Sequence, residues 1–213
     1  MQEGPVVNLI WATPNAQEII LKCARVSADP EAKTNSGMKL LQYLIKNKHW
    51  SPFEMAYFCV EIWTTRDISR QIVRHHTLNI QEFSQRYQDL GKIQQVAITR
   101  EARLQDRKNR QNSLEIDDDE LKQKWDQMQK EAWSVTSTLY HEALSMGIAK
   151  EQARAVLPEG LTQSHMYVCG NIRSWIHYCQ VRTDPSTQKE HRRVAELIKE
   201  ILIELIPEIK DLI

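Results

Sequence analysis

Residues 74 to 87, RHHTLNIQEFSQRY, concentrate side chains that could bind a small molecule. Two arginines, two histidines, a glutamate, a serine and an asparagine fall within this short stretch. Its apolar residues are too few and too irregularly spaced to build a core face, and they are Leu78, Ile80, Phe83 and Tyr87. The segment is therefore a better candidate for a binding site than for a part of the core.

A short helix over residues 66–73 would place Arg70, Gln71 and Arg74 within one turn, because positions three and four apart share a face. Guanidinium groups match the oxygens of phosphate and carboxylate, so the cluster favours a phosphorylated small molecule. Glu82 could accept hydrogen bonds from a sugar hydroxyl or a base N–H. A solvated surface loop with internal salt bridges is the alternative that spacing leaves open.

A second polar group lies downstream, where Arg154 precedes the stretch GNIRSWIHYCQVR at residues 170–182. Four of its polar residues lie close to one helical face, namely Asn171, Ser174, His177 and Arg182. The same pattern also fits an ordinary amphipathic helix.

Composition excludes several classes of protein. The 213 residues fit a single domain over residues 1–213, and a formal net charge of zero argues against a nucleic-acid coat or a membrane patch. The first residues lack a signal or membrane segment, so we expect a soluble cytoplasmic protein. The four cysteines form no CxxC pair, which favours buried free thiols over zinc ligands, disulfides or a nucleophile.

The periodicity of apolar residues predicts an α+β fold, with a small mixed sheet and several long helices. Thr13 and Pro14 look like the N-cap and first position of a helix. We expect strands at 6–13 and 56–65, and helices after Pro14 and at 36–48, 66–73, 119–146, 170–182 and 186–205.

The helix over 119–146 carries an apolar seam with alternating steps of four and three, formed by Leu121, Trp125, Met128, Ala132, Val135 and Leu139. The seam is typical of a core or subunit-packing face rather than a cofactor site. The acidic run just before it suits the positive end of the helix dipole, so a solvated helix start is favoured over a metal site.

Five blocks in this order resemble the flavin-dependent thymidylate synthases. The family signature Arg-His-Arg, seven residues, then Ser is similar to Arg74-His75-His76, TLNIQEF, Ser84. The other matching blocks are KHWSPFEMAYF, SRQIVRHH, ARAVLP with GNIRSWIHYCQVR, and STQKE. His76 stands where the family usually has Arg, and Asn79 where it often has Ser.

The resemblance implies synthesis of dTMP from dUMP by reductive methylation, as a methyltransferase of nucleotide biosynthesis. Methylenetetrahydrofolate would donate the one-carbon unit, FAD would be the redox cofactor, and NADPH the reductant. It also implies a homotetramer with sites shared between protomers, binding only small molecules, without nucleic acid or membrane partners.

Residue by residue, the resemblance makes Arg182 catalytic, by stabilising charge on the uracil. It implies dUMP contacts at Gln71, Arg74, Glu82, Ser84, Gln85, Arg86, Arg154 and Arg182. It implies FAD contacts at His49, Ser51, Arg74, His75, His76, Glu82, Asn171, Arg173 and His177, and no metal ligand. Ser84 could be a nucleophile, but no base is evident, and a binding role is favoured.

Two other readings compete. A metal-dependent nucleotide phosphohydrolase would use His75, His76, His177, Asp184 and His191 as ligands. Adjacent histidines are hard to aim at one ion, and no HExxH pattern is present. A nucleotide- or RNA-binding module is the second, against which the zero net charge and the lack of an RNA-binding motif both argue.

Overall fold

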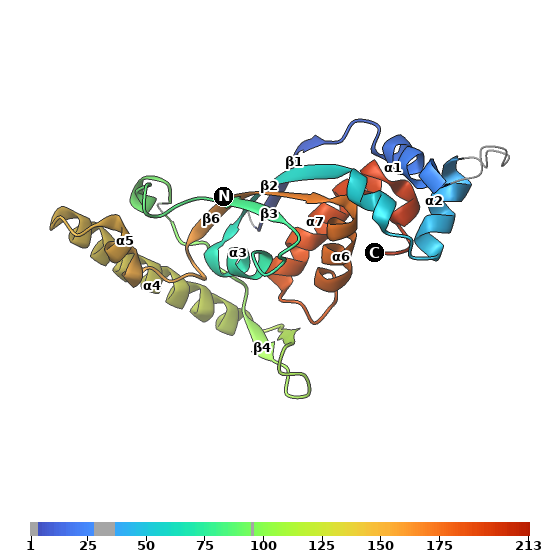
Figure 1. Cartoon of the computed structure of the whole chain (residues 1–213). Coiled ribbons are helices and arrows are strands. Elements are labelled where there is room, and N and C mark those ends of the chain that lie inside the picture. The colour runs from blue at the N-terminus through green and yellow to red at the C-terminus, as the bar shows by residue number, and fades with distance from the viewer. Residues whose placement is uncertain (1–3, 28–36, 95) are drawn as a thin grey trace. The chain divides into compact units, whose positions relative to one another are not determined.

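The computed structural model describes residues 4–27, 37–94 and 96–213, and it contains both helices and strands (Figure 1). The α-helices are α1 Ala16–Ala24, α2 Gly37–Lys46, α3 Arg66–Ile72, α4 Asp119–Ser145, α5 Lys150–Ala153, α6 Ile172–Arg182 and α7 Lys189–Leu205. The strands are β1 Val6–Ala12, β2 Tyr57–Thr65, β3 Asn79–Glu82, β4 Arg103–Gln105, β5 Ser113–Glu115 and β6 Gln163–Asn171. Short 3₁₀ helices are η1 Arg25–Ser27, η2 Ser51–Met55, η3 Leu90–Lys92, η4 Arg154–Val156 and η5 Pro207–Ile209. The predicted α+β class is confirmed.

The chain forms two compact units. Unit 1 contains Met1–Ile62, Val73–Gln81 and Tyr167–Ile213, and unit 2 contains Trp63–Ile72 and Glu82–Met166. The single domain expected from the sequence stays a prediction.

Four strands form one sheet in the order β1-β2-β6-β3. The side chains of β2 alternate, because Phe58, Val60 and Ile62 are fully buried while Glu61 is half-buried. Tyr167 of β6 hydrogen-bonds Glu61, and two residues back along β6 His165 stacks on Trp63. This pairing gives β2 and β6 an antiparallel register.

The interior of unit 1 is built by two neighbouring helices, α6 and α7, which run side by side in Figure 1. Trp175 of α6 stacks on Phe58 of β2 with ring centroids 4.8 Å apart, and its indole N–H donates to the Phe58 carbonyl at 3.3 Å. Val194, Ile198 and Leu202 of α7 are fully buried at steps of four, as the predicted helix requires.

Unit 2 has its own core around α4. Its buried members are Leu90, Trp133, Tyr140, Ala153 and Leu161. The α4 helix begins and ends as its sequence predicts, with the Asp118 carboxylate accepting from the Leu121 N–H at 2.9 Å and Gly147 following at φ 83°.

One prediction about local structure is wrong. Thr13 does not cap the first helix, because α1 begins after Asn15, which adopts left-handed backbone angles without a side-chain cap. The Thr13 hydroxyl instead accepts from the Tyr57 N–H at 2.9 Å, so it joins the start of β2. Residues 100–118, for which the sequence predicted no element, contain the antiparallel hairpin β4–β5.

The apolar seam of α4 is not a core face of this chain. Met128 and Val135 are 52% and 60% exposed, while the buried residues of α4 are Gln129, Trp133 and Tyr140 on another side of the helix. The core alternative is therefore wrong, and subunit packing stays a prediction. All four cysteines are free thiols, with Cys59 and Cys179 buried and the other two half-buried.

Candidate functional site

In unit 2, the Glu82 carboxylate is the centre of a hydrogen-bonded cluster. It accepts from the hydroxyls of Ser69 on α3 and Ser164 on β6, both at 2.7 Å. Arg70 forms a close ion pair with it, and an Arg66 nitrogen lies 3.6 Å from it. The helix α3 brings Arg66, Ser69 and Arg70 together because they lie three and four positions apart.

The surroundings of Glu82 decide its charge. Burial favours the neutral form, but hydrogen bonds from Ser69 and Ser164 and the charges of Arg70 and Arg66 outweigh it and lower the pKa of Glu82. Burial also lowers the pKa of Arg66, and the positive charge of Arg70 adds to that effect. Glu82 is therefore a carboxylate at neutral pH, able to accept further hydrogen bonds.

The residues that follow β3 bring two predicted phosphate ligands to the same helix. The Arg86 side chain donates to the Glu151 carboxylate at 3.0 Å, and the Arg154 side chain donates to the Glu151 carbonyl at 3.3 Å. Ser84 accepts from the backbone N–H of Arg86 at 3.3 Å, and Gln85 is buried. Arg86 and Arg154 thus both contact Glu151 of α5.

In unit 1, the predicted catalytic arginine contacts the signature histidine. Arg182 ends α6, and its Nε donates to Nε2 of His75 at 2.9 Å. Burial lowers the pKa of His75 to about 4, and the charges of Arg182, His177 and His76 act in the same direction. Because a guanidinium only donates, His75 is neutral and keeps its proton on Nδ1.

The start of α6 holds three of the predicted flavin contacts. Asn171 is its N-cap and accepts from the Ser174 N–H at 2.8 Å. Arg173, two residues after Asn171, forms a close ion pair with Glu54 of η2. His177 is exposed on the same helix.

The remaining predicted residues of unit 1 lie before η2 and around His75. His49 packs edge-on against Tyr43 with ring centroids 5.7 Å apart, and Ser51 is the first residue of η2. Arg74 and His76 flank His75 and are both exposed, which leaves their side chains open to a ligand.

The predicted site residues are divided between the two units. Unit 2 holds Gln71, Glu82, Ser84, Gln85, Arg86 and Arg154. Unit 1 holds His49, Ser51, Arg74, His75, His76, Asn171, Arg173, His177 and Arg182. Within each unit, side chains far apart in sequence meet as described above.

Sequence reasoning missed three members of the Glu82 cluster, Arg66, Ser69 and Ser164. The spacing of Arg66 and Ser69 from Arg70 on one predicted helix could have revealed the first two. No sequence signal connects Ser164 to Glu82, because the strand β6 supplies it from 82 positions away.

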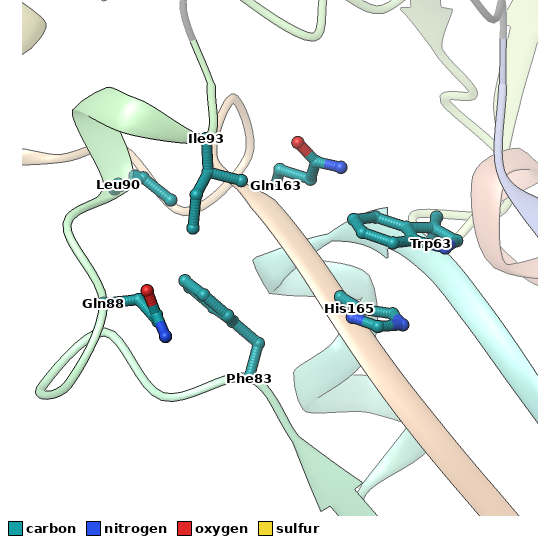
Figure 2. A pocket seen from close by; sticks show the side chains of 7 residues that line it. All are labelled: Trp63, Phe83, Gln88, Leu90, Ile93, Gln163 and His165. Atoms are coloured by element: carbon teal, nitrogen blue, oxygen red, sulfur yellow. The ribbon is translucent and has the colours of Figure 1, made fainter.

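A cavity of about 300 Å³ in unit 2 lies on the opposite face of the sheet from the Glu82 cluster. Glu82 bonds to Ser164, whereas the next residues along, Phe83 and His165, turn to the other face and line the cavity in Figure 2, where His165 lies beside Trp63. Its lining residues are Trp63, Phe83, Gln88, Leu90, Ile93, Gln163 and His165. The cavity therefore uses none of the predicted dUMP or FAD ligands.

Neither a metal site nor a membrane-spanning helix is found in the described part of the chain. There, no group of three or more His, Cys, Asp or Glu side chains could hold a metal ion. Of the ligands proposed for a phosphohydrolase, His191 bonds the Tyr178 hydroxyl in the interior and Asp184 accepts from Ser186. Among the same residues, no helix is long and apolar enough to cross a membrane.

Comparison of the sequence with known proteins identifies the family of this chain. Residues 8–208 match the profile described as thymidylate synthase complementing protein, a span that includes every candidate residue. The flavin-dependent thymidylate synthase of a Synechocystis strain is 46% identical over 189 residues, 89% of this chain and 85% of that protein. The chain belongs to the flavin-dependent thymidylate synthase family.

Two further similarities agree with that membership. A probable flavin-dependent thymidylate synthase of Paramecium bursaria Chlorella virus 1 is 42% identical over 196 residues, 91% of this chain and 88% of that protein. The crystal structure of a UMP/dUMP methylase, PolB from Streptomyces cacaoi, bound with 5-Br UMP superposes with a TM-score of 0.82. It is 26% identical and covers 97% of this chain and 92% of its own. The family fold expected from the signature blocks is confirmed.

Proposed function

We propose that the protein synthesises dTMP from dUMP by reductive methylation, with methylenetetrahydrofolate as one-carbon donor, FAD as redox cofactor and NADPH as reductant. The observation that carries the proposal is the contact between Arg182 and His75, which joins the downstream block to the signature at 2.9 Å. Membership of the family supports the same activity.

Arg182 is the catalytic residue of this proposal. Its guanidinium lies against the uracil and stabilises the negative charge that develops as N3 ionises. The group suits this role because it cannot lose its own proton, and because His75 fixes its direction.

The nucleotide is held in this proposal by arginines and by the polar side chains predicted to contact dUMP. Arg74, Arg86 and Arg154 bind the phosphate, since arginine forks match its oxygens. Glu82, whose lowered pKa keeps it charged, accepts hydrogen bonds from the nucleotide. Gln71, Ser84 and Gln85 complete the dUMP contacts, Ser84 as a binding group.

Several of the side chains predicted to contact FAD fit a flavin dinucleotide. Arg74, His76 and Arg173 are exposed N–H donors suited to diphosphate oxygens. The residues that would hold FAD are His49, Ser51, Arg74, His75, His76, Glu82, Asn171, Arg173 and His177. Bound there, FAD supplies the redox chemistry of the one-carbon reduction, while the protein binds and orients.

We also propose a cytoplasmic homotetramer with sites shared between protomers. The exposed apolar seam of α4 supports subunit packing, because Met128 and Val135 have no core to fill in their own chain.

Purified protein tests the function directly. We expect it to bind about one FAD per chain, and to form dTMP only when dUMP, methylenetetrahydrofolate and NADPH are all present. A colourless protein that releases phosphate from dUMP with a divalent metal would instead make it the phosphohydrolase.

A further inference from the structure

We propose that Tyr178 and His191 are positioning residues, whose buried hydrogen-bonded pair fixes the ring of His75 and, through it, the guanidinium of Arg182. The inference rests on the proposed function for the role of Arg182. Neither Tyr178 nor His191 would touch the nucleotide or the flavin.

The pair lies in the interior between α6 and α7. Tyr178 and His191 are both fully buried, and the Tyr178 hydroxyl lies 3.0 Å from Nε2 of His191. Tyr178 stands one turn before Arg182 on α6, so the two side chains share a face of the helix. His191 belongs to the first turn of α7, the neighbouring helix.

The ring of Tyr178 connects this pair to His75. His75 packs edge-on against Tyr178, with centroids 4.8 Å apart and planes at 68°. Tyr178 also meets Trp175 edge-on, with ring centroids 5.6 Å apart and planes at 86°. Trp175 is itself stacked on Phe58 of the sheet, so Tyr178 packs among buried aromatic side chains.

The protons of the pair follow from its burial. Burial raises the pKa of Tyr178, so the phenol keeps its proton. Burial lowers the pKa of His191 to about 3, and the charges of Arg182 and His75 add to this. His191 is therefore neutral, and its Nε2 accepts the Tyr178 hydrogen, because a buried hydroxyl needs an acceptor.

A purely structural role does not account for the polar groups. Phenylalanine and leucine would fill the same volume without the cost of burying a hydroxyl and an imidazole. A satisfied buried polar pair, in contrast, specifies one orientation of its rings. Here the pair fixes the orientation of the Tyr178 ring. His75 packs against that ring and accepts the hydrogen bond from Arg182.

The groups that face His75 are Arg182 and His177 on α6, the neighbouring His76, and Tyr178 and His191 beneath it. Loosening the pair would admit water to His75 and let it bind a proton near its ordinary pKa. Protonated His75 cannot accept from Arg182, so the arginine would lose its fixed direction.

Four variants of the full-length, flavin-loaded protein test this. His191→Leu removes the acceptor, His191→Gln retains one, and Tyr178→Phe removes a single oxygen atom. Tyr140→Phe is the matched control, because Tyr140 is also a buried tyrosine with a bonded hydroxyl, but in unit 2.

We expect His191→Leu and Tyr178→Phe to lower kcat for dTMP formation about tenfold, since misplacing a catalytic group slows the chemical step. The KM for dUMP should change less than about threefold, because the lost interaction belongs to the transition state. His191→Gln should recover most of the activity, and Tyr140→Phe should match the wild type.

A second readout needs no activity. In NMR titrations, the pKa of His75 should rise from about 4 toward 6.5 in His191→Leu and in Tyr178→Phe. If the wild type forms no dTMP, the proposed function fails, yet this titration still decides the positioning role. Folded variants with unchanged kcat and unchanged His75 titration would overturn it, as would an equal loss in Tyr140→Phe. If His191→Leu does not fold, Tyr178→Phe decides alone.

Discussion

The Arg182–His75 pair of unit 1 and the Glu82 cluster of unit 2 both hold charges in place, but by different means. Arg182 is directed by a neutral imidazole that rests on buried aromatic rings. Glu82 is directed by two hydroxyl groups and two guanidinium groups, one of which, Arg70, is largely exposed.

The pKa is lowered in both His75 and Glu82, but the effect on charge is opposite. In His75 it removes a positive charge, which leaves Arg182 as the cation of the pair. In Glu82 it retains a negative charge, which the nearby arginines neutralise. The Arg182–His75 pair therefore orients one cation, whereas the Glu82 cluster balances several charges.

The largest effect should come from Arg182→Ala. Without its guanidinium we expect dTMP formation to fall by about 10³-fold or more, because a fixed charge at the reacting ring is lost. FAD should stay largely bound, since the other flavin ligands remain. Product chromatography and flavin absorbance measure both quantities, and near-normal synthesis would remove the catalytic role of Arg182.

Glu82→Gln should be next. The amide keeps the shape but leaves the half-buried Arg66 and the exposed Arg70 without a counter-charge, so we expect a loss of about 2 kcal/mol in the free energy of unfolding. Urea denaturation at pH 7 measures this loss.

The sign of the pH dependence follows from the lowered pKa of Glu82. The Glu82 carboxylate stabilises the folded protein fully above its ordinary pKa of 4.5. This stabilisation is lost as the pH falls through the lower pKa that Glu82 has in the folded protein. The difference in the free energy of unfolding between Glu82→Gln and the wild type should therefore become smaller below about pH 4.5. A difference that stays constant from pH 7 to pH 3 would contradict the charge argument.

An equal or smaller effect on stability is expected from substituting one glycine in each unit. A Cβ on Gly170 would lie 2.4 Å from the buried side chain of Leu78, whereas a Cβ on Gly91 would meet the end of the exposed His141 ring. We expect Gly170→Ala to cost about 2 kcal/mol of stability and Gly91→Ala much less, because only His141 can move aside. Equal losses in urea unfolding would count against the packing described for unit 1.

The smallest effect should be that of His76→Arg. The change restores the residue usual in the family signature at an exposed position, so FAD binding should be preserved or tightened by a few-fold. A flavin titration measures it. A large loss of affinity would mean that His76 does not lie at the flavin.

The elements that the sequence predicts well are those with a long, regular pattern. Residues 119–146 and 186–205 form α4 and α7, and residues 56–65 form β2, within a few residues of the expected ends. Three-residue strands such as β4 and β5 have no such pattern. The predicted cap at Thr13 is wrong because the Thr13 hydroxyl makes a tertiary hydrogen bond to Tyr57 instead.

The candidate site divides in the same way. The signature blocks identified His75 and Arg182, but only the fold shows that they touch. Ser164 and His191 reach their partners from elements distant in sequence, so spacing could not reveal them. Tyr178 reads as an apolar helix position, and its hydrogen bond to His191 is a tertiary feature.

The central claim is that arginines from separate segments of the chain bind one nucleotide beside a flavin. A crystal structure of the protein with dUMP and FAD tests it most directly. We predict the phosphate in hydrogen-bond contact with Arg74, Arg86 and Arg154, from one or more copies of the chain, and the uracil against Arg182 and the flavin ring. A nucleotide bound away from all four arginines would contradict the account.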